Sequence, residues 1–190
     1  MPFDSQPSTV NPYAAPTAPV SDPPPPANVE PVFFAAGLFK LAIMSVGTCG
    51  FYHVYWSYKN WKCVSRLTGQ DFNAPLRAFF YPFTSYALFH HIETEGRKRG
   101  TDMPSNAGFL ALVLFLLCVL RRMPDPYWVI GLLAFLPLLP VQSAVNQINR
   151  HATPDADPNA RLHGWNVLAV IVGGSLTAWV VASLFYPALQ

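Results

Sequence analysis

The sequence predicts an all-α integral membrane protein: a bundle of four transmembrane helices, one interfacial or partly inserted helix, and a disordered Pro-rich N-terminal tail. The first observation is composition, because hydrophobic residues make up 52% of the 190 residues and charged residues only 12%. Soluble domains carry about 25% charged residues. The second observation is that long uncharged runs recur along the chain. We therefore expect lipid to replace water around much of it.

Residues 1–31 are predicted to form the disordered tail. Residues 1–30 contain nine prolines, including the run "PPPP" at 23–26, and no lysine or arginine. The tail therefore lacks the basic segment and the apolar segment of a signal peptide. Its small, scattered apolar residues cannot bury a core, which favours disorder with local polyproline II character. A ligand for a proline-binding partner domain is the more specific alternative.

Residues 32–190 are predicted to form one helical membrane domain. The uncharged runs in this part of the chain cover residues 41–58, 78–92, 103–120, 126–149 and 162–190. A helix needs about 20 residues, with a range of about 17 to 25, to cross the hydrocarbon core. Four of the five runs are long enough, and they predict spans at about 38–60, 104–120, 127–148 and 165–186.

The run at 78–92 is too short to span and is interrupted by Pro82. We expect it to belong to an interfacial helix at about 75–93. With this helix lying flat, nine of the twelve Lys and Arg residues fall on one side of the membrane, Arg150 and Arg161 among them. If it crosses, the split is six to six. The positive-inside rule then favours the flat helix, a cytoplasmic 150–161 loop and an external N-terminus.

The aromatic stretch "TCGFYHVYWSYKNW" at 48–61 is predicted to end the first span. Twenty residues that start at Leu41 reach the far side of the hydrocarbon near Asn60. Tryptophan, tyrosine and lysine concentrate at the headgroup level because each has an apolar body and a polar end. The predicted interfacial anchors are Lys40 at one face and, at the other, Trp56, Tyr58, Lys59, Trp61 and Lys62.

The first part of the same stretch is a candidate intramembrane polar patch. Its members are Thr48, Cys49, Gly50, Tyr52 and His53. On one helix the i, i+4 spacing of Cys49 and His53 would let both reach a metal or haem group. The alternative is a threonine bonded to its own backbone, a glycine that allows close approach or a bend, and a histidine paired inside the bundle. The sequence fixes no further ligands, so we expect no cofactor, metal or catalytic residue.

The sequence also carries a recognisable signature. The segment "KLAIMSVGTCGFYHVYWSYKNWK", followed by "RAFF" at 77–80, resembles a family of small, uncharacterised bacterial multi-pass membrane proteins. Their shared pattern is similar to T-x-G-x-Y-x-x-Y-W-x-Y-K-N-W, which matches residues 48–61 here. The resemblance covers roughly residues 33–92 and more loosely 146–190. It implies a membrane location, in the bacterial cytoplasmic (inner) membrane, and it implies no activity.

Two further patterns concern helix packing and transport. Gly174, Ala178 and Ala182 recur every four residues, a spacing that lets helices approach closely within one chain or between two copies. Residues 142–149 alternate an apolar face with a polar face after Pro137 and Pro140. That polar face predicts either a polar pathway or a helix that surfaces into the headgroups.

These observations rank three hypotheses for function. The first is a non-enzymatic multi-pass membrane protein that acts through interactions, as an assembly factor, scaffold or accessory subunit. The alternative is a small transporter or channel component, and the second alternative is an intramembrane metal or redox protein that uses Cys49 and His53. The expected partners are the lipid bilayer and either another protein or a second copy. A net charge of +2 without a basic run disfavours nucleic acid.

Overall fold

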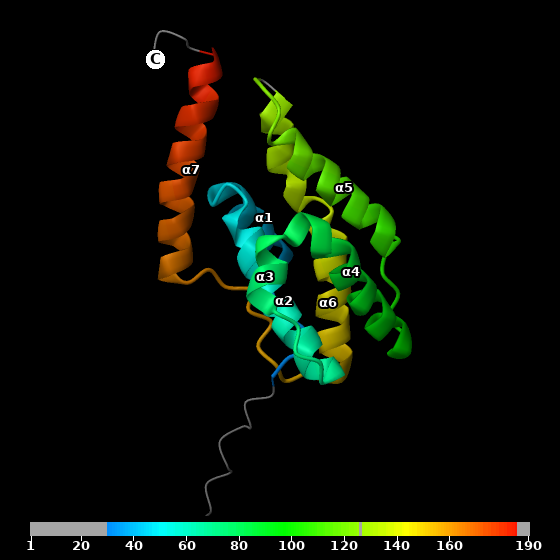
Figure 1. The fold of residues 1–190 in the computed structure, drawn as a ribbon. Helices are drawn as coiled ribbons and strands as arrows, with labels where there is room; N and C mark the ends of the chain where they lie inside the picture. The colour runs from blue at the N-terminus through cyan, green and yellow to red at the C-terminus, as the bar shows by residue number, and fades with distance from the viewer. Residues whose placement is uncertain (1–29, 126, 186–190) are drawn as a thin grey trace, which may run out of the picture.

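A computed structural model describes residues 30–125 and 127–185 of the chain. The elements, in order, are α1 (Leu38–Gly47), α2 (Phe51–Thr68), α3 (Ala74–Phe79), α4 (Tyr81–Lys98), α5 (Ala107–Leu120), the 3-10 segment η1 (Tyr127–Phe135), α6 (Leu138–Ala152) and α7 (Gly164–Phe185), as Figure 1 shows. Within the described residues every element is helical, which confirms the all-α prediction for that part. The predicted tail lies almost wholly outside them.

The predicted first span at 38–60 is wrong, because the chain reverses between Gly47 and Phe51. Gly50 N–H donates to the Ser45 carbonyl (2.7 Å) and Cys49 N–H donates to the Val46 carbonyl (3.1 Å), the hydrogen-bond pair of a Schellman motif. Cys49 (φ 48°) and Gly50 (φ 82°) are both left-handed. Two consecutive residues of that kind end one helix and start another in a new direction. Residues 38–68 therefore form an α1–α2 hairpin.

The two arms of the α1–α2 hairpin run back along each other. Phe34 N–H, just before α1, donates to Asn60 Oδ1 in α2 (3.2 Å). The Phe34 ring also meets the Tyr55 ring edge-on, with 5.6 Å between centroids. The beginning of α1 thus lies beside the middle of α2, and residues 48–50 form the hairpin tip. In Figure 1 α1 rises to this tip and α2 descends from it.

Among the described residues, two segments are long and apolar enough to cross a membrane, Tyr127–Ala152 and Gly164–Ser183, so the four predicted spans are not supported. Helix α5 has 14 residues, or about 21 Å at 1.5 Å per residue, which is short of the hydrocarbon thickness. The segment predicted to span at 127–148 changes from η1 to α6 at Pro137, the N-cap residue of α6. A proline lacks the N–H that continuous helix pairing needs.

The predicted interfacial helix at 75–93 is two helices. Pro75 and Pro82 each lie in the first turn of a helix, α3 and α4, where a missing N–H costs nothing. Helix α4 then runs on to Lys98 and packs against α2, α5 and α6. It is therefore part of the bundle.

Helix α7 differs from every other element, because it is apolar yet hardly covered. Thr177 is the only buried residue between Gly164 and Ser183. Trp165 is 82% exposed and Val172 is 62% exposed. A core helix of a soluble protein would be buried over most of its length. An uncovered apolar helix of this length supports a membrane location.

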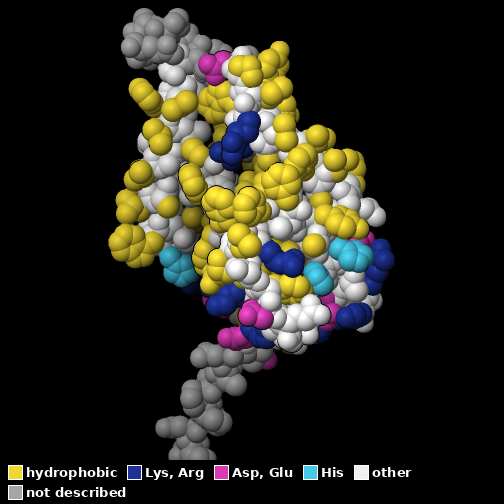
Figure 2. Space-filling model, viewed as in Figure 1, with side chains coloured by type: hydrophobic (Ala, Val, Ile, Leu, Met, Phe, Trp, Pro, Cys, Tyr) yellow, Lys and Arg dark blue, Asp and Glu magenta, His cyan; other side chains and the backbone are white. Residues whose placement is uncertain are grey.

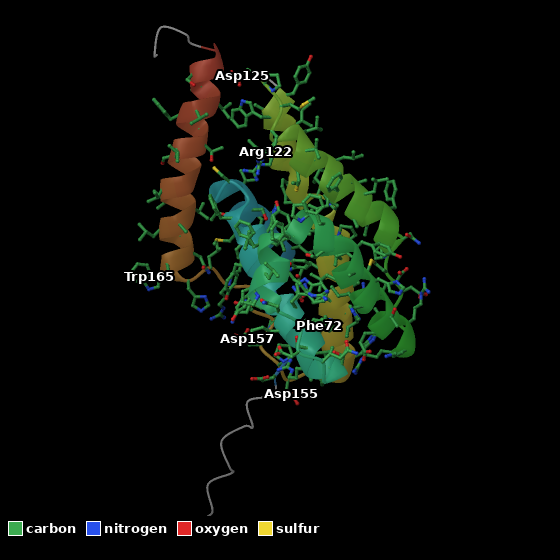
Figure 3. The ribbon with its side chains drawn as sticks, in the orientation of Figure 1. Phe72, Arg122, Asp125, Asp155, Asp157 and Trp165 are labelled. Atoms are coloured by element: carbon green, nitrogen blue, oxygen red, sulfur yellow. The ribbon has the colours of Figure 1, made fainter. Side chains whose placement is uncertain are left out.

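Charge and apolar surface are separated along the molecule. On the face seen in Figure 2, hydrophobic side chains cover the upper part, and most charged side chains gather at the lower end. Figure 3 places Arg122 and Asp125 in the upper part, and Asp155 and Asp157 near the lower end. This is the distribution expected of a chain whose upper part lies in lipid and whose lower end meets water.

Candidate functional site

The base of the hairpin is held by three side chains of α6. Asn149 Oδ1 accepts from Phe33 N–H (3.0 Å), and Asn149 Nδ2 donates to the Phe33 carbonyl (2.9 Å). Gln142 Nε2 donates to the Phe34 carbonyl (3.2 Å). Asn146 Nδ2 donates to the Ala36 carbonyl (2.9 Å). These residues, one turn of helix apart, form an amide ladder along the extended segment 33–36.

The amide ladder leaves none of its own polar atoms unpaired. Gln142 Nε2 also donates to Asn146 Oδ1 (2.8 Å), and Gln142 Oε1 accepts from Trp56 Nε1 (2.5 Å). The polar face predicted at 142–149 is therefore bonded, through these amides, to other parts of the same chain. It satisfies the backbone of a segment that has no helical partners of its own.

Three predicted interfacial anchors are buried instead. Trp56 is 2% exposed and Trp61 is 0% exposed. Lys40 is 4% exposed, and its Nζ donates to Asn159 Oδ1 (2.8 Å) and to the Arg161 carbonyl (3.0 Å). Because the chain reverses at residues 48–50, α2 runs through the middle of the bundle. The remaining anchors are partly or fully exposed: Tyr58, Lys59 and Lys62.

The contact of Lys40 with Arg161 also corrects the predicted orientation of the N-terminus. The sequence placed Lys40 and the 150–161 loop on opposite sides of the membrane. The structure brings them together, and it joins Phe33 to Asn149 at the same end. Residue 30 and the loop after α6 therefore share one side.

At the hairpin tip, an arginine meets the end of α1. Arg121 Nη2 donates to the carbonyl of Cys49 (2.5 Å). The end of α1 also carries the negative pole of its helix dipole, which attracts a cation. A Cβ at position 50 would collide with Arg121 Nη1, so the end of that flexible side chain would have to shift, and the left-handed φ of 82° itself favours glycine there. The sequence does not point to Arg121, because 72 positions separate it from Cys49.

The tip also touches the middle of α7. Cys49 Sγ lies 2.7 Å from Thr177 Oγ1, and a Cβ at Gly173 would collide with the Gly47 carbonyl. Thr177 is 13 residues beyond Gly164, or about 20 Å along a helix of about 33 Å. If α7 spans the bilayer, the tip and its arginine lie nearer to the side where α7 ends than to the side where it begins.

The predicted packing stripe is not the surface by which α7 contacts the rest of the chain. Gly173 and Thr177 make the contacts described above, whereas nothing lies within 4 Å of a Cβ placed on Gly174. Ala178 is exposed and Ala182 is partly exposed. The stripe Gly174, Ala178 and Ala182 thus stands one residue away from the contact face.

His53 is buried at the tip without a hydrogen-bond partner. It is 2% exposed, and neither ring nitrogen has a partner among the described residues. Its ring meets Tyr81 edge-on at 5.7 Å, and Tyr81 Oη lies 3.3 Å from Cys118 Sγ. The expected pairing of His53 inside the bundle is not observed there. An unpaired buried polar group normally indicates a missing partner.

Cys49 and His53 do not form the predicted i, i+4 pair, because Cys49 precedes α2 and its sulfur contacts Thr177. The described ranges contain no group of three or more His, Cys, Asp or Glu placed to hold a metal ion. Thr48 is bonded to the backbone of its own helix, as the alternative interpretation predicts, since its Oγ1 donates to the Met44 carbonyl (2.6 Å). It also accepts from Tyr52 N–H (3.0 Å). Tyr52 itself lines a different cavity, beside Lys40 and Asn159.

A cleft of about 650 Å³ opens beside the tip. Cys49, Gly50, Cys118, Arg121 and Arg122 contribute its polar lining. The rest of the wall is apolar and comes from Phe51, Val54, Phe79, Phe80, Tyr81, Pro82 and Phe83. Within the described ranges, neither arginine has a carboxylate within 4.0 Å. The site is thus a cationic pocket with an aromatic wall.

At the end of α4, toward the lower end, several cations are matched by carboxylates. Glu95 Oε1 accepts from Arg99 Nε (2.9 Å), and Lys98 Nζ donates to Glu95 Oε2 (3.2 Å). Partial burial alone would raise the pKa of Glu95, but the hydrogen bonds from Arg99 and Lys98 outweigh it and lower the pKa. Arg97 pairs similarly with Glu93 (2.8 Å). These exposed pairs contribute little to stability but keep this end polar.

Comparison with protein-family models, with curated protein sequences and with solved structures found no match for the chain. The resemblance of residues 48–61 to a bacterial membrane family therefore stays a prediction.

Proposed function

We propose that the chain is a multi-pass protein of the bacterial cytoplasmic membrane that acts by binding, as an assembly factor, scaffold or accessory subunit, without catalysing a reaction. The observation that carries the membrane location is α7, an apolar helix of which only Thr177 is buried between Gly164 and Ser183. The binding role is supported by the cleft at the hairpin tip, whose arginines lack carboxylate partners within the described residues.

The proposed topology has a re-entrant first element. The α1–α2 hairpin would enter and leave the bilayer from one side. Helix α5 would rise to the 121–125 turn, η1 and α6 would return, and α7 would cross alone. On the face seen in Figure 2, most Lys and Arg side chains gather toward the lower end, which the positive-inside rule assigns to the cytoplasm.

The alternative functions lose support from the same geometry. The transport hypothesis drew on Gln142 and Asn146, whose amides bind the chain's own backbone. The metal or redox hypothesis drew on Cys49, whose sulfur contacts Thr177. Binding at the tip cleft needs neither feature.

Thiol accessibility tests this topology. In a variant without the three native cysteines, single changes Glu30→Cys, Asp125→Cys, Asp155→Cys and Ser175→Cys are treated with a membrane-impermeant maleimide in intact cells and in inverted vesicles. We expect Glu30→Cys and Asp155→Cys to react from the cytoplasmic side, and Asp125→Cys from the other. Ser175 is exposed on α7, so Ser175→Cys should react only after detergent is added.

Two results would contradict the proposal. Reaction of Ser175→Cys with the reagent in undisturbed membranes would show that water, not lipid, covers α7. Reaction of Glu30→Cys and Asp155→Cys from opposite sides would show that α1 and α2 cross as one span.

A further inference from the structure

We infer that the cleft at the hairpin tip binds the headgroup of an anionic phospholipid, with its phosphate on Arg121 and Arg122 and its acyl chains along the phenylalanines of α2, α3 and α4. This inference rests on the proposed function, because it takes the cleft to open into a bilayer. It identifies the ligand class for a site that is otherwise defined only by its lining.

The charge of the cleft calls for an anion. A guanidinium has five N–H donors, and the described residues give Arg121 one hydrogen bond, to the Cys49 carbonyl. They give the Arg122 side chain none. Asp125, the nearest acidic residue in sequence, accepts instead from Trp128 Nε1 (2.7 Å). An uncompensated arginine inside a bilayer costs about 2.5 to 3.5 kcal/mol, so a phosphate that paired with it would be favoured.

The apolar wall is suited to acyl chains. Phe51 is 78% exposed, and Phe79 and Phe83 are each 70% exposed. All three line the cleft that also holds the arginines. A soluble anion such as free phosphate would leave these rings uncovered. A phospholipid satisfies both parts of the cleft at once, because its charged and apolar portions are joined.

His53 adds a polar group beside the cationic part of the cleft. A Cβ at Gly50, which would collide with Arg121 Nη1, would lie 3.6 Å from His53 Nδ1. The neutral ring offers one donor and one acceptor, and both lack partners in the described structure. His53 does not itself line the cleft, so its unpaired ring shows that polar pairing is incomplete behind Gly50.

The test uses the full-length protein in nanodiscs of phosphatidylcholine, with phosphatidylglycerol added in increasing amounts. The readout is the midpoint of thermal unfolding and the mole fraction of phosphatidylglycerol that gives half its maximal rise. We expect the anionic lipid to raise the midpoint of the unsubstituted protein. For Arg122→Gln we expect the half-saturating fraction to increase on the order of tenfold, as the loss of one charge-assisted hydrogen bond predicts.

Arg97→Gln is the matched control, because Arg97 is paired with Glu93 at the lower end. It should keep the response of the unsubstituted protein. Arg121→Gln should lose the response too, but it also removes the hydrogen bond to Cys49 and can fail to fold. The Arg122 side chain has no hydrogen bond to lose within the described chain, so Arg122→Gln is the deciding variant.

Each other outcome overturns the inference. Equal responses in Arg122→Gln and Arg97→Gln would show that general surface charge, and not a site at Arg122, causes the rise of the unfolding midpoint. The same rise from inorganic phosphate in pure phosphatidylcholine discs would identify a soluble anion as the ligand. If the protein enters nanodiscs but its unfolding midpoint does not respond to phosphatidylglycerol, the lipid site alone is refuted. If the protein does not enter nanodiscs, the proposed membrane function is refuted as well.

Discussion

The base and the tip of the α1–α2 hairpin both bury polar groups, but they differ in whether those groups have hydrogen-bond partners. At the base, the amide ladder of Gln142, Asn146 and Asn149 pairs every side-chain oxygen and nitrogen that it contains. At the tip, His53 has no partner and Arg121 has one, within the described residues. Complete pairing is what a structural network requires, whereas incomplete pairing is found where a ligand completes the set. The comparison separates the part that holds the fold from the part that is open to a partner.

The largest expected effect lies at the base. Asn149→Leu leaves the N–H and the carbonyl of Phe33 unpaired, although Phe33 is fully buried. We expect the free energy of unfolding to fall by about 2–4 kcal/mol, at about 1–3 kcal/mol for each group. Chemical unfolding in a mild detergent measures the loss. Gln147→Leu is the control on the same helix, and an equal loss there would mean that the ladder does not hold the hairpin.

The next effect concerns the contact of the tip with α7. Gly173→Ala places a Cβ against the Gly47 carbonyl, and we expect a loss of about 1–3 kcal/mol from overpacking. Gly174→Ala meets nothing within 4 Å and should stabilise the helix by about 0.5–1 kcal/mol. Unfolding midpoints of the two variants provide the comparison. A larger loss for Gly174→Ala would restore the predicted stripe as the packing face.

The third effect should have the opposite sign from the first. His53→Leu removes a buried ring whose nitrogens are unpaired, so we expect a change between zero and about 1 kcal/mol of stabilisation in detergent without added lipid. Gln142→Leu, which unpairs Trp56 Nε1 and the Phe34 carbonyl, should destabilise. If His53→Leu destabilises as much as Gln142→Leu, the histidine is already satisfied and the contrast between base and tip disappears.

The smallest effect is a pH dependence at the lower end. Partial burial, with the charges of His90, Arg77 and Lys98, lowers the pKa of His91. The unfolded chain therefore binds this proton more readily than the folded one. The neutral His91 ring therefore contributes to the stability of the folded state. This contribution is complete above the unfolded pKa of about 6.5 and is lost as the pH falls through that value toward the folded pKa. Unfolding midpoints between pH 8 and 5 should fall less steeply in His91→Phe, and identical slopes would contradict this.

The sequence predicted the helical class and the two segments long enough to span because both follow from local apolar content. It missed the reversal at residues 48–50 because a hydropathy pattern does not show where the chain changes direction. Gly50 was a signal for a bend, but Cys49 in a left-handed conformation is stabilised only by its surroundings. Trp56 and Trp61 were placed at a surface for the same reason, since their burial depends on where α2 turns.

The candidate site was predicted in part. Cys49, Gly50 and His53 lie at the tip as a polar cluster, but Arg121 and Thr177 come from distant segments that no local pattern connects to them. The polar face of α6 was visible in the sequence, and its role was not. Gln142 and Asn149 bind the backbone of residues 33 and 34, more than 100 positions away. Only the tertiary structure shows that the backbone of residues 33–36 lies within hydrogen-bonding distance of these amides.

The distances along the chain between the hairpin and its partners set an order for assembly. Phe33 bonds to a residue 116 positions later, and Cys49 meets one 128 positions later. At about 5–20 residues per second, a ribosome needs on the order of ten seconds to make those partners. The base of the hairpin therefore lacks its partners until α6 emerges, and the tip lacks Thr177 until α7 emerges. Any chaperone or insertase that handles this protein would meet the reversed turn first, and would have to release it last.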